Sequence, residues 1–494
     1  MSPFVILACV ASYFAALLGI ASWSGRRSTR DGYFRGNQRA PWFLIAFGLI
    51  GDSLSGLTFI SVPGQVGEHG FTYLQIILGN VVGYLLIAYW LLPHFYRLDL
   101  TSIYGFLGNG LGLGAQRTGA GFFLLSRLLG SAARLYLAIR VFQSQLFEPL
   151  GIPLFVSVVI VIGLILGYTL KGGIKTLIWT DAFQSGFLLL SVVLSIGTIG
   201  YQLHVGPIGL VHAIQSSTTF HWLNTDWRAP DFFAKQMVSG AAMALVMNGL
   251  DQNNMQKNLS CRSLADAQRN LQSFAGVMLV VNAAFLALGA LLYHYLSVKN
   301  ISLPAGSTDT VFPELALHHL GRFAAVVFVI GLSAATFNSA DSVLTTLTTS
   351  CCVDFLKFPT KEGTLSNGQI RTRSMVHCTF AALLFIAILG FQLFPKTSAI
   401  QLVLEMATYT YGPLLGLFVL AFFTRWRLTG PGIPLVCMGA PVVSWWVHLE
   451  SPRWFGGYQM GLEVLLFNGL ITAIGLGLFA TNRRRIDSDT GLSQ

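Results

Sequence analysis

Charged residues are scarce in this sequence. Asp, Glu, Lys and Arg together make up 10% of its 494 residues, whereas hydrophobic residues make up 53%. A typical soluble domain carries roughly 25% charged residues, so the composition excludes an ordinary soluble enzyme and a disordered chain. Six cysteines are too few for a disulfide scaffold of this length. Apolar runs of about 20 residues, the length that crosses a bilayer as a helix, recur along the chain and predict an all-α membrane protein.

Motifs for catalysis and metal binding are missing as well. The cysteines form neither a CxxC pair nor a Cys/His ligand pattern, which argues against a zinc site. The sequence has no Gly-x-Ser-x-Gly, no HExxH and no paired Asp-rich motif. Long hydrophilic segments are absent too. We therefore expect neither an enzyme, nor an organic cofactor, nor a fused catalytic domain.

The apolar runs predict thirteen membrane spans in a single transmembrane domain over residues 1–494. The first run lacks the basic start and the cleavage site of a signal peptide, so we predict a retained helix. The predicted spans are residues 3–22, 42–66, 72–96, 118–147, 153–170, 177–202, 234–250, 270–297, 319–353, 372–394, 398–424, 431–448 and 462–481.

Lysines and arginines gather on one side of this predicted arrangement. If the N-terminus lies outside, 21 of the 30 bases fall in inside loops, among them Lys171, Lys175 and Lys257. Cytoplasmic loops are enriched in Lys and Arg, so we predict an outside N-terminus and a cytoplasmic C-terminus. This topology explains the net charge of +10 without a nucleic-acid partner. For so compact a chain, a plasma membrane, and by default a bacterial inner membrane, is the expected location.

The second span is interrupted by polar and flexible residues. Residues 51–56 read Gly-Asp-Ser-Leu-Ser-Gly, and Pro63 follows within the same span. Glycine loosens a helix and proline removes a hydrogen-bond donor. A broken helix at membrane depth is a sequence pointer to a transporter's ligand site. Close packing of small residues is the alternative, but it does not explain the central Asp52.

A second break follows five spans later. The seventh span is short and ends in Met-Asn-Gly-Leu-Asp-Gln at residues 247–252. This spacing predicts two inverted five-helix repeats, residues 42–202 and 234–424, with the substrate between the two breaks. Residues 1–41 then form an extra helix and a basic loop. Residues 425–494 form the extra C-terminal helices and a short tail.

The ninth span carries a stripe of oxygen-bearing side chains. Asn338, Asp341, Ser342 and Thr345 recur at helical spacing with Ala335, so they share one face. An Asp in mid-membrane costs roughly 2.5–3.5 kcal/mol on insertion scales, and a bound cation with oxygen ligands would offset that cost. Hydrogen bonding of Ser and Thr to the helix carbonyls is the alternative for the hydroxyls.

Other charged residues in the spans are open to two interpretations. Asp181, which opens the sixth span, fits either an interfacial residue near basic loops or a second carboxylate for a cation. Glu405 fits either a gate or a structural pair. Arg134 fits pairing with an acid or binding of an anionic substrate, whereas Arg140 fits snorkelling to the interface.

The two broken spans, the polar ninth span and a series of short motifs along the chain resemble the sodium:solute symporter family. This family includes sodium/proline, sodium/glucose and sodium/sialic acid carriers. The resemblance implies a LeuT-like inverted five-plus-five helix repeat, with one extra helix before it and two after it. It also implies sodium-coupled import of a small polar organic solute by alternating access. The likeness covers about residues 30–425 and rests on Tyr33-Phe34-Arg35-Gly36, Leu54-Ser55 to Pro63, Leu100 to Tyr104, Gly172-Gly173-Ile174 to Asp181, Asp251-Gln252 to Gln256-Lys257, and Pro413 to Leu417.

The resemblance implies sodium ligands at named positions. The family's shared sodium site would consist of the carbonyls of Gly51, Leu54 and Ala335 with the side chains of Asn338 and Ser339. Family members usually have two adjacent hydroxyls where this chain has Asn338-Ser339. A possible second sodium site would consist of Asp181, Asn338, Asp341 and Ser342.

The two breaks suggest which residues line a substrate cavity. The Arg that sialic acid carriers place on the fourth span has no clear counterpart here, because Gly130 stands near that position between Arg127 and Arg134. The substrate class therefore stays open at this stage. The candidate substrate-binding residues are Asp52, Ser53, Ser55, Thr58, Tyr73, Gln75, Asn248, Gln252 and Glu405.

The expected partners are a small-molecule solute, sodium ions and the lipid bilayer, and the sequence does not indicate an oligomeric state. A proton-coupled carrier that uses Asp181 and Asp341 is one alternative function. A transport-like membrane sensor that needs a separate partner is another.

Overall fold

A computed structural model describes residues 3–24, 42–98, 102–217, 220–303, 307–358, 366–393 and 399–482 of the chain. The side chains of residues 3, 24, 168, 170–176, 339, 399 and 482 lie outside this description. The segment Tyr33–Gly36, the residues Leu100 and Thr101, and the C-terminal arginines 483–485, all used above as sequence signals, lie outside it too.

Nearly all of the described chain is helical. Two short strands, β1 (Trp426–Leu428) and β2 (Ala480–Asn482), pair antiparallel with Trp426 opposite Asn482. The main helices are α1 (Pro3–Ser24), α3 (Trp42–Ser53), α4 (Gly56–His69), α5 (Tyr73–Leu86), α6 (Leu92–Arg97), α7 (Tyr104–Gly110), α8 (Leu113–Phe142), α9 (Leu154–Leu203), α10 (Pro207–Gln215), α11 (Phe233–Ala244), α12 (Gln252–Asn258), α13 (Leu264–Lys299), α14 (Val311–Glu314), α15 (Gly321–Ser350), α16 (Asn367–Gly390), α17 (Ala399–Phe423), α18 (Gly432–Trp454) and α19 (Val464–Gly477).

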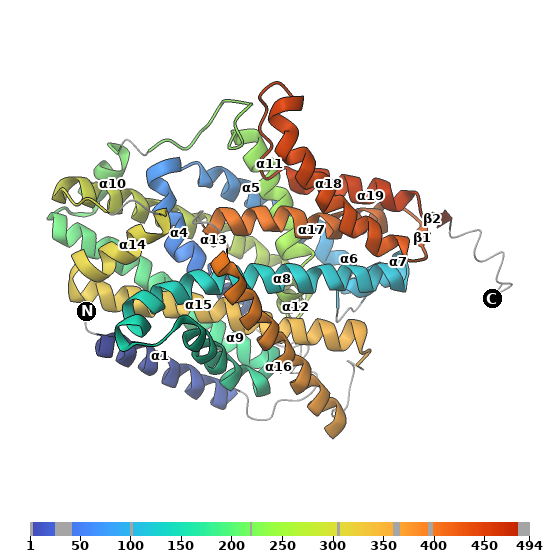
Figure 1. The fold of residues 1–494 in the computed structure, drawn as a ribbon, viewed down its shortest axis with the longest axis horizontal. Helices are drawn as coiled ribbons and strands as arrows, with labels where there is room; N and C mark the ends of the chain where they lie inside the picture. Colours follow the sequence, from blue (N-terminus) through green and yellow to red (C-terminus); the bar gives the residue numbers. More distant parts are fainter. Residues whose placement is uncertain are drawn as a thin grey trace.

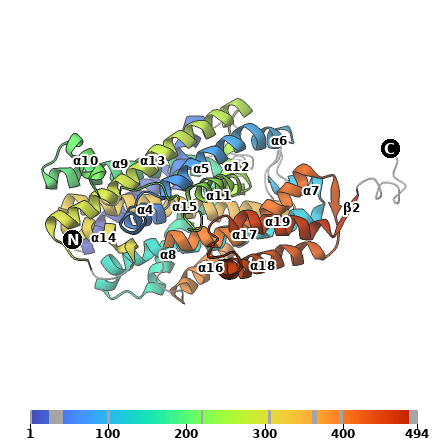
Figure 2. The same cartoon turned by 90° about the horizontal axis from the view of Figure 1, so that it is seen from above.

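The long helices run side by side as a bundle. Figure 1 shows α8, α13, α15 and α17 along its long axis, with the β1–β2 pair at the opposite end from the start of α1. The view from above shows the same separation (Figure 2). This arrangement places the middles of several helices, rather than their ends, at the centre of the molecule.

The predicted spans correspond to helices, but their number stays a prediction. Among the described residues, nine helices are long and apolar enough to cross a membrane, or ten if α3 and α4 form one broken span. The segments Leu154–Gly167 and Val464–Gly477 are shorter apolar helices, and α11 is shorter still. These three match the remaining predicted spans.

The sequence predicts a loop between the fifth and sixth spans, around Lys171 and Lys175. This prediction is wrong, because the chain stays helical there. α9 is helical without interruption from Leu154 to Leu203, through Gly172 and Gly173. A glycine within a helix costs only about 1 kcal/mol relative to alanine, so two glycines lower the helix propensity without ending the helix.

The predicted break in the second span is present. α3 and α4 meet at an angle of 60°. Ser55 between them is extended (φ −81°, ψ 172°), and Pro63 lies inside α4. The hydroxyl of Tyr293 on α13 donates to the carbonyl of Gly64 at 2.7 Å, which gives one backbone carbonyl beside the proline a partner inside the protein. Buried breaks of this kind are tolerated only where protein or water satisfies the backbone.

The second break separates α11 from α12. A π-helical turn, Leu245–Gly249, ends α11, and Asp251 then turns extended and caps α12. The carboxylate of Asp251 accepts hydrogen bonds from the backbone N–H groups of Asn253 (2.9 Å) and Asn254 (3.4 Å). An N-cap carboxylate satisfies donors that the first helical turn leaves free. The polar sequence thus begins a short helix that is buried along its length.

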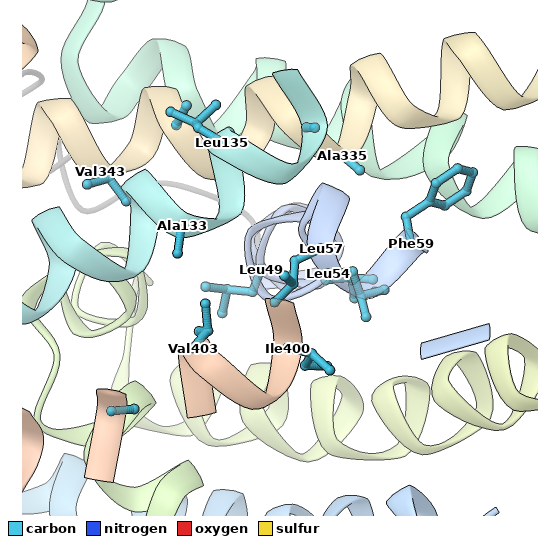
Figure 3. Packing of buried hydrophobic residues seen from close by; sticks show 14 of the residues in the cluster. Leu49, Leu54, Leu57, Phe59, Ala133, Leu135, Ala335, Val343, Ile400 and Val403 are labelled. Atoms are coloured by element: carbon cyan, nitrogen blue, oxygen red, sulfur yellow. The ribbon is translucent and has the colours of Figure 1, made fainter. Parts of the chain in front are cut away.

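Both breaks lie in the packed interior. Figure 3 shows Leu54 and Leu57 at the first break, with Ile400 and Val403 of α17 on one side and Ala133 and Leu135 of α8 on another. All six residues are buried. The first break is therefore surrounded by hydrophobic side chains from α8 and α17.

Candidate functional site

A cavity of about 110 Å³ is lined by both helix breaks. The first break contributes residues 52–55, and the second contributes Met247 and Asn248. Helices α5, α8, α13 and α17 complete the wall. The polar residues in this wall are Asp52, Ser53, Ser55, Thr58, Tyr73, Asn80, Tyr84, Arg127, Arg134, Asn248, Asn254 and Asn282.

Six of the nine candidate substrate-binding residues line this cavity: Asp52, Ser53, Ser55, Thr58, Tyr73 and Asn248. The structure places the other three elsewhere. Gln75 donates to the carbonyl of Trp222 at 2.7 Å, and the side-chain oxygen of Gln252 accepts from the backbone N–H of Ile103 at 2.9 Å. Glu405 lines a separate outer cavity.

That outer cavity adjoins the inner one. It has a volume of about 700 Å³, and residues of the segment that was predicted to face outside, Pro230 and Asp231, line it. Tyr73, Ile76, Ile400 and Leu404 line both cavities, so they form the wall between them. This wall separates the inner cavity from the outer one.

A buried ion pair ties α8 to the second break. Nε of Arg127 lies 2.7 Å from one carboxylate oxygen of Asp251, and Nη2 donates to the other at 2.9 Å. The hydroxyl of Tyr411 on α17 also donates to Asp251, at 2.9 Å. Charge-assisted, two-pronged bonds of this kind are both strong and directional. Asp251 therefore caps α12 and joins three helices at one point.

A second buried cluster surrounds Lys257, which was predicted to lie in an inside loop. That placement is wrong: Lys257 lies on α12 in the interior, with a side chain that is 2% exposed. Its Nζ lies 2.6 Å from Oδ2 of Asp181 and 3.6 Å from Oδ2 of Asp52. It also donates to Oγ of Ser342 at 2.9 Å. Asn253 donates to Asp52 as well.

Arg134 differs from these two cations. It lines the inner cavity, and its Nε is buried without a hydrogen-bond partner in the part of the chain that the structure describes. Arg140, one turn and a half further on, is exposed and lies over the ring of Tyr136. A buried polar nitrogen without a hydrogen-bond partner is costly, and a ligand that accepts from this nitrogen would offset that cost.

The proposed shared sodium site lies where α3 ends against α15. A Cβ on Gly51 would come within 2.3 Å of Nδ2 of Asn338 on α15 and of Oγ of Ser185 on α9, so glycine at this position allows α3 to lie close to both side chains. The backbone N–H of Gly51 donates to Ser185 at 3.0 Å. The Oδ1 atom of Asn338 is buried without a hydrogen-bond partner among the described residues. An amide oxygen in this position is available as a cation ligand.

The remaining predicted sodium ligands are placed as follows. Ala335 and Asn338 are buried on α15, as are Asp341 and Ser342 one turn further on. Leu54 lies between α3 and α4, and the side chain of Ser339 lies outside the described residues. Asp341 accepts from the backbone N–H of Ser342 at 2.6 Å.

Substituting alanine for Gly51 tests this close approach. The added methyl group would clash with Asn338 and Ser185, so we expect the apparent sodium affinity to fall about tenfold and the protein to lose about 1–3 kcal/mol of stability. Gly276→Ala on α13 is the matched control, because its Cβ would meet no atom within 4 Å. Sodium-dependent thermal unfolding measures both effects. Equal behaviour of the two variants would contradict the assignment of Gly51.

Sequence reasoning missed the roles of Lys257 and Arg127. Both are basic residues whose partners, Asp181 and Asp251, are distant in the sequence. The available signal was the rule that ionisable groups inside a membrane pair with one another. For Arg127 in the fourth span, this rule predicts an acidic partner on another span.

The sodium:solute symporter family profile matches residues 33–433. The chain belongs to this family. Its relatives include the sodium/sialic acid symporter of Proteus mirabilis, 24% identical over 449 residues that cover 87% of each chain. The human sodium/iodide cotransporter is 25% identical and covers 91% of this chain and 69% of its own. A solved outward-open state of a Na+-coupled sialic acid symporter has a TM-score of 0.78 at 21% identity, covering 96% of this chain and 97% of the other.

These comparisons confirm three predictions. The resemblance to the family is confirmed, and so are the helical LeuT-like fold class and sodium-coupled symport of a solute. This symporter is thus a multi-pass membrane transporter whose cargo includes sodium ions. The boundaries of the two repeats, the individual site residues and the orientation of the termini stay predictions.

Proposed function

We propose that this symporter imports a small anionic solute, and that Arg134 binds its negative charge. The protein acts as a transporter without an enzymatic activity, in a bacterial inner membrane, with its N-terminus outside. The start of α1 and the β1–β2 pair lie at opposite ends of the bundle, which supports termini on different sides of the membrane (Figures 1 and 2).

The single observation that carries the proposal is the charge balance of the inner cavity. Asp52 accepts a hydrogen bond from Asn253 and shares the ammonium of Lys257 with Asp181, and Arg127 is paired with Asp251. Arg134 also lines the cavity, but unlike Arg127, which pairs with Asp251, it forms no ion pair among the described residues. A planar guanidinium matches a carboxylate geometrically, and nearby amides and hydroxyls such as Asn80, Asn248 and Tyr73 suit the rest of a polar solute. Two reported relatives, by their names, also carry anions: sialic acid and iodide.

Sodium has a structural role in this proposal. A sodium ion bound between Gly51 on α3 and Asn338 on α15 ties the broken helix to the long buried helix and fixes the wall of the solute cavity. Each ligand then raises the affinity for the other by the same factor, as linkage requires. In this proposal, sodium and solute enter while the wall between the two cavities is open. Once both are bound, the wall closes over them, and the protein can then open to the other side of the membrane. For each net positive charge that the transport cycle moves inward, an inside-negative potential of 100 mV adds about 2.3 kcal/mol to the driving force for import.

Thermal stability of the purified protein tests solute class and sodium coupling together. We expect a carboxylate from a panel of sugars, amino acids, monocarboxylates and sialic acid to raise the melting temperature in sodium, and to raise it much less in potassium. Neutral sugars serve as the matched control within the panel. Stabilisation by a neutral sugar and by no anion would overturn the anionic assignment. Equal stabilisation in potassium would overturn the coupling to sodium.

A further inference from the structure

Lys257 stands where the second sodium ion was expected. The proposed second site consisted of Asp181, Asn338, Asp341 and Ser342. In the structure, the ammonium of Lys257 contacts two of these four residues, at 2.6 Å from Oδ2 of Asp181 and 2.9 Å from Oγ of Ser342. A cation that bound both of these oxygens would have to occupy the volume that the ammonium fills.

The lysine is held in place by its helix. α12 begins at the cap formed by Asp251, and all of its residues are buried. Asp251 is itself fixed by Arg127 and Tyr411. The side chain of Lys257 is 2% exposed. The ammonium is therefore part of the packed interior and not a surface group.

The contacts of the ammonium suit a permanent cation. Asp181 and Asp52 supply two carboxylates from different helices, α9 and α3, and Ser342 adds a hydroxyl oxygen from α15. A sodium ion also seeks oxygen ligands from several helices. The lysine thus occupies the contacts of two of the four residues expected at a second cation site, Asp181 through Oδ2 and Ser342 through Oγ. Asn338, which both expected sites share, keeps an Oδ1 without a hydrogen-bond partner among the described residues and so stays available to a single sodium ion.

We propose that Lys257 is a built-in cation that replaces the second sodium ion, so that this symporter binds one sodium ion per chain. The inference rests on the proposed function, because it assumes that the shared site binds sodium. With a solute of one negative charge, a transport cycle that carries one sodium ion moves no net charge.

The number of bound sodium ions tests this inference without knowledge of the solute. Purified protein in detergent is titrated with radioactive sodium, and the bound ions per chain are counted. We expect one ion per chain and a Hill coefficient near one. Two ions per chain would overturn the role of Lys257 and leave sodium coupling intact. Absence of saturable sodium binding would overturn both this inference and the proposed coupling.

Two variants give a matched comparison. Lys257→Met keeps the length of the side chain and removes its charge, so Asp181 becomes free to bind a cation, and we expect the count to rise to two ions. Lys257→Met combined with Asp181→Asn removes both charges, and we expect the count to return to one. An unchanged count of one in Lys257→Met would contradict the inference. If that variant does not fold, the count for the unmodified protein decides alone.

Discussion

Replacing Arg127 by methionine is expected to lower the free energy of unfolding by about 3–5 kcal/mol, the usual loss when one partner of a buried ion pair is removed. The carboxylate of Asp251 would stay in the interior with no exposed surface and without its cation. Tyr411 and the N–H groups of α12 would still donate to it, but they carry no full charge. Thermal unfolding in detergent measures the loss.

The surface pair of Arg453 and Glu450 provides the control. Its closest N–O distance is 3.1 Å, against 2.7 Å in the buried pair, and the side chain of Arg453 is 80% exposed. Exposed ion pairs contribute about 0–1 kcal/mol, so Arg453→Met should change stability little. The double variant Arg127→Met with Asp251→Asn should recover much of the loss, because it removes both buried charges and keeps a capping side chain on α12. Similar losses for Arg127→Met and Arg453→Met would show that burial does not set the strength of this pair.

Replacing Arg134 by glutamine is expected to weaken binding of the anionic solute about 10- to 150-fold. This range corresponds to the loss of a hydrogen bond to a charged group, about 1.5–3 kcal/mol. Stability without solute should stay the same or rise, because Nε of Arg134 has no hydrogen-bond partner in the described part of the chain. Ligand-induced thermal shifts measure the affinity, and unfolding without ligand measures the stability.

Two comparisons separate a binding role of Arg134 from a structural one. Arg134→Lys keeps the charge but not the planar fork, so we expect an affinity between those of the unmodified protein and Arg134→Gln. Arg127→Met, in contrast, should lose stability. A loss of stability in Arg134→Gln as large as that in Arg127→Met, with unchanged solute affinity, would mean that Arg134 supports the fold and does not bind the solute.

The helices and the first break could be predicted because their signals are local. An apolar run of about 20 residues predicts a span by itself. Glycine, aspartate and serine within one such run predict a break, and α3 and α4 do meet there at 60°. Local signals also mislead, because the interruption of the apolar pattern around Lys171 and Lys175 suggested a loop where α9 continues.

The contacts of the site could not be predicted in the same way. Asp181 and Lys257 are 76 positions apart, and Arg127 and Asp251 are 124 positions apart. Only the packing of α8, α9 and α12 decides which acid meets which base. For this reason the sequence placed Lys257 in a loop and left Arg134 with two interpretations. Six of the candidate cavity residues lie together because they belong to the two breaks or to the helix next to the first one.

Uptake into sealed proteoliposomes tests the central claim most directly. The vesicles contain the purified protein, and the labelled anion that gives the largest thermal shift is supplied outside with either a sodium or a potassium gradient. The account predicts accumulation above the external concentration with an inward sodium gradient, no accumulation with potassium, and strong reduction in Arg134→Gln. Equal accumulation in potassium under a proton gradient, or no uptake of the bound anion under any gradient, would contradict it.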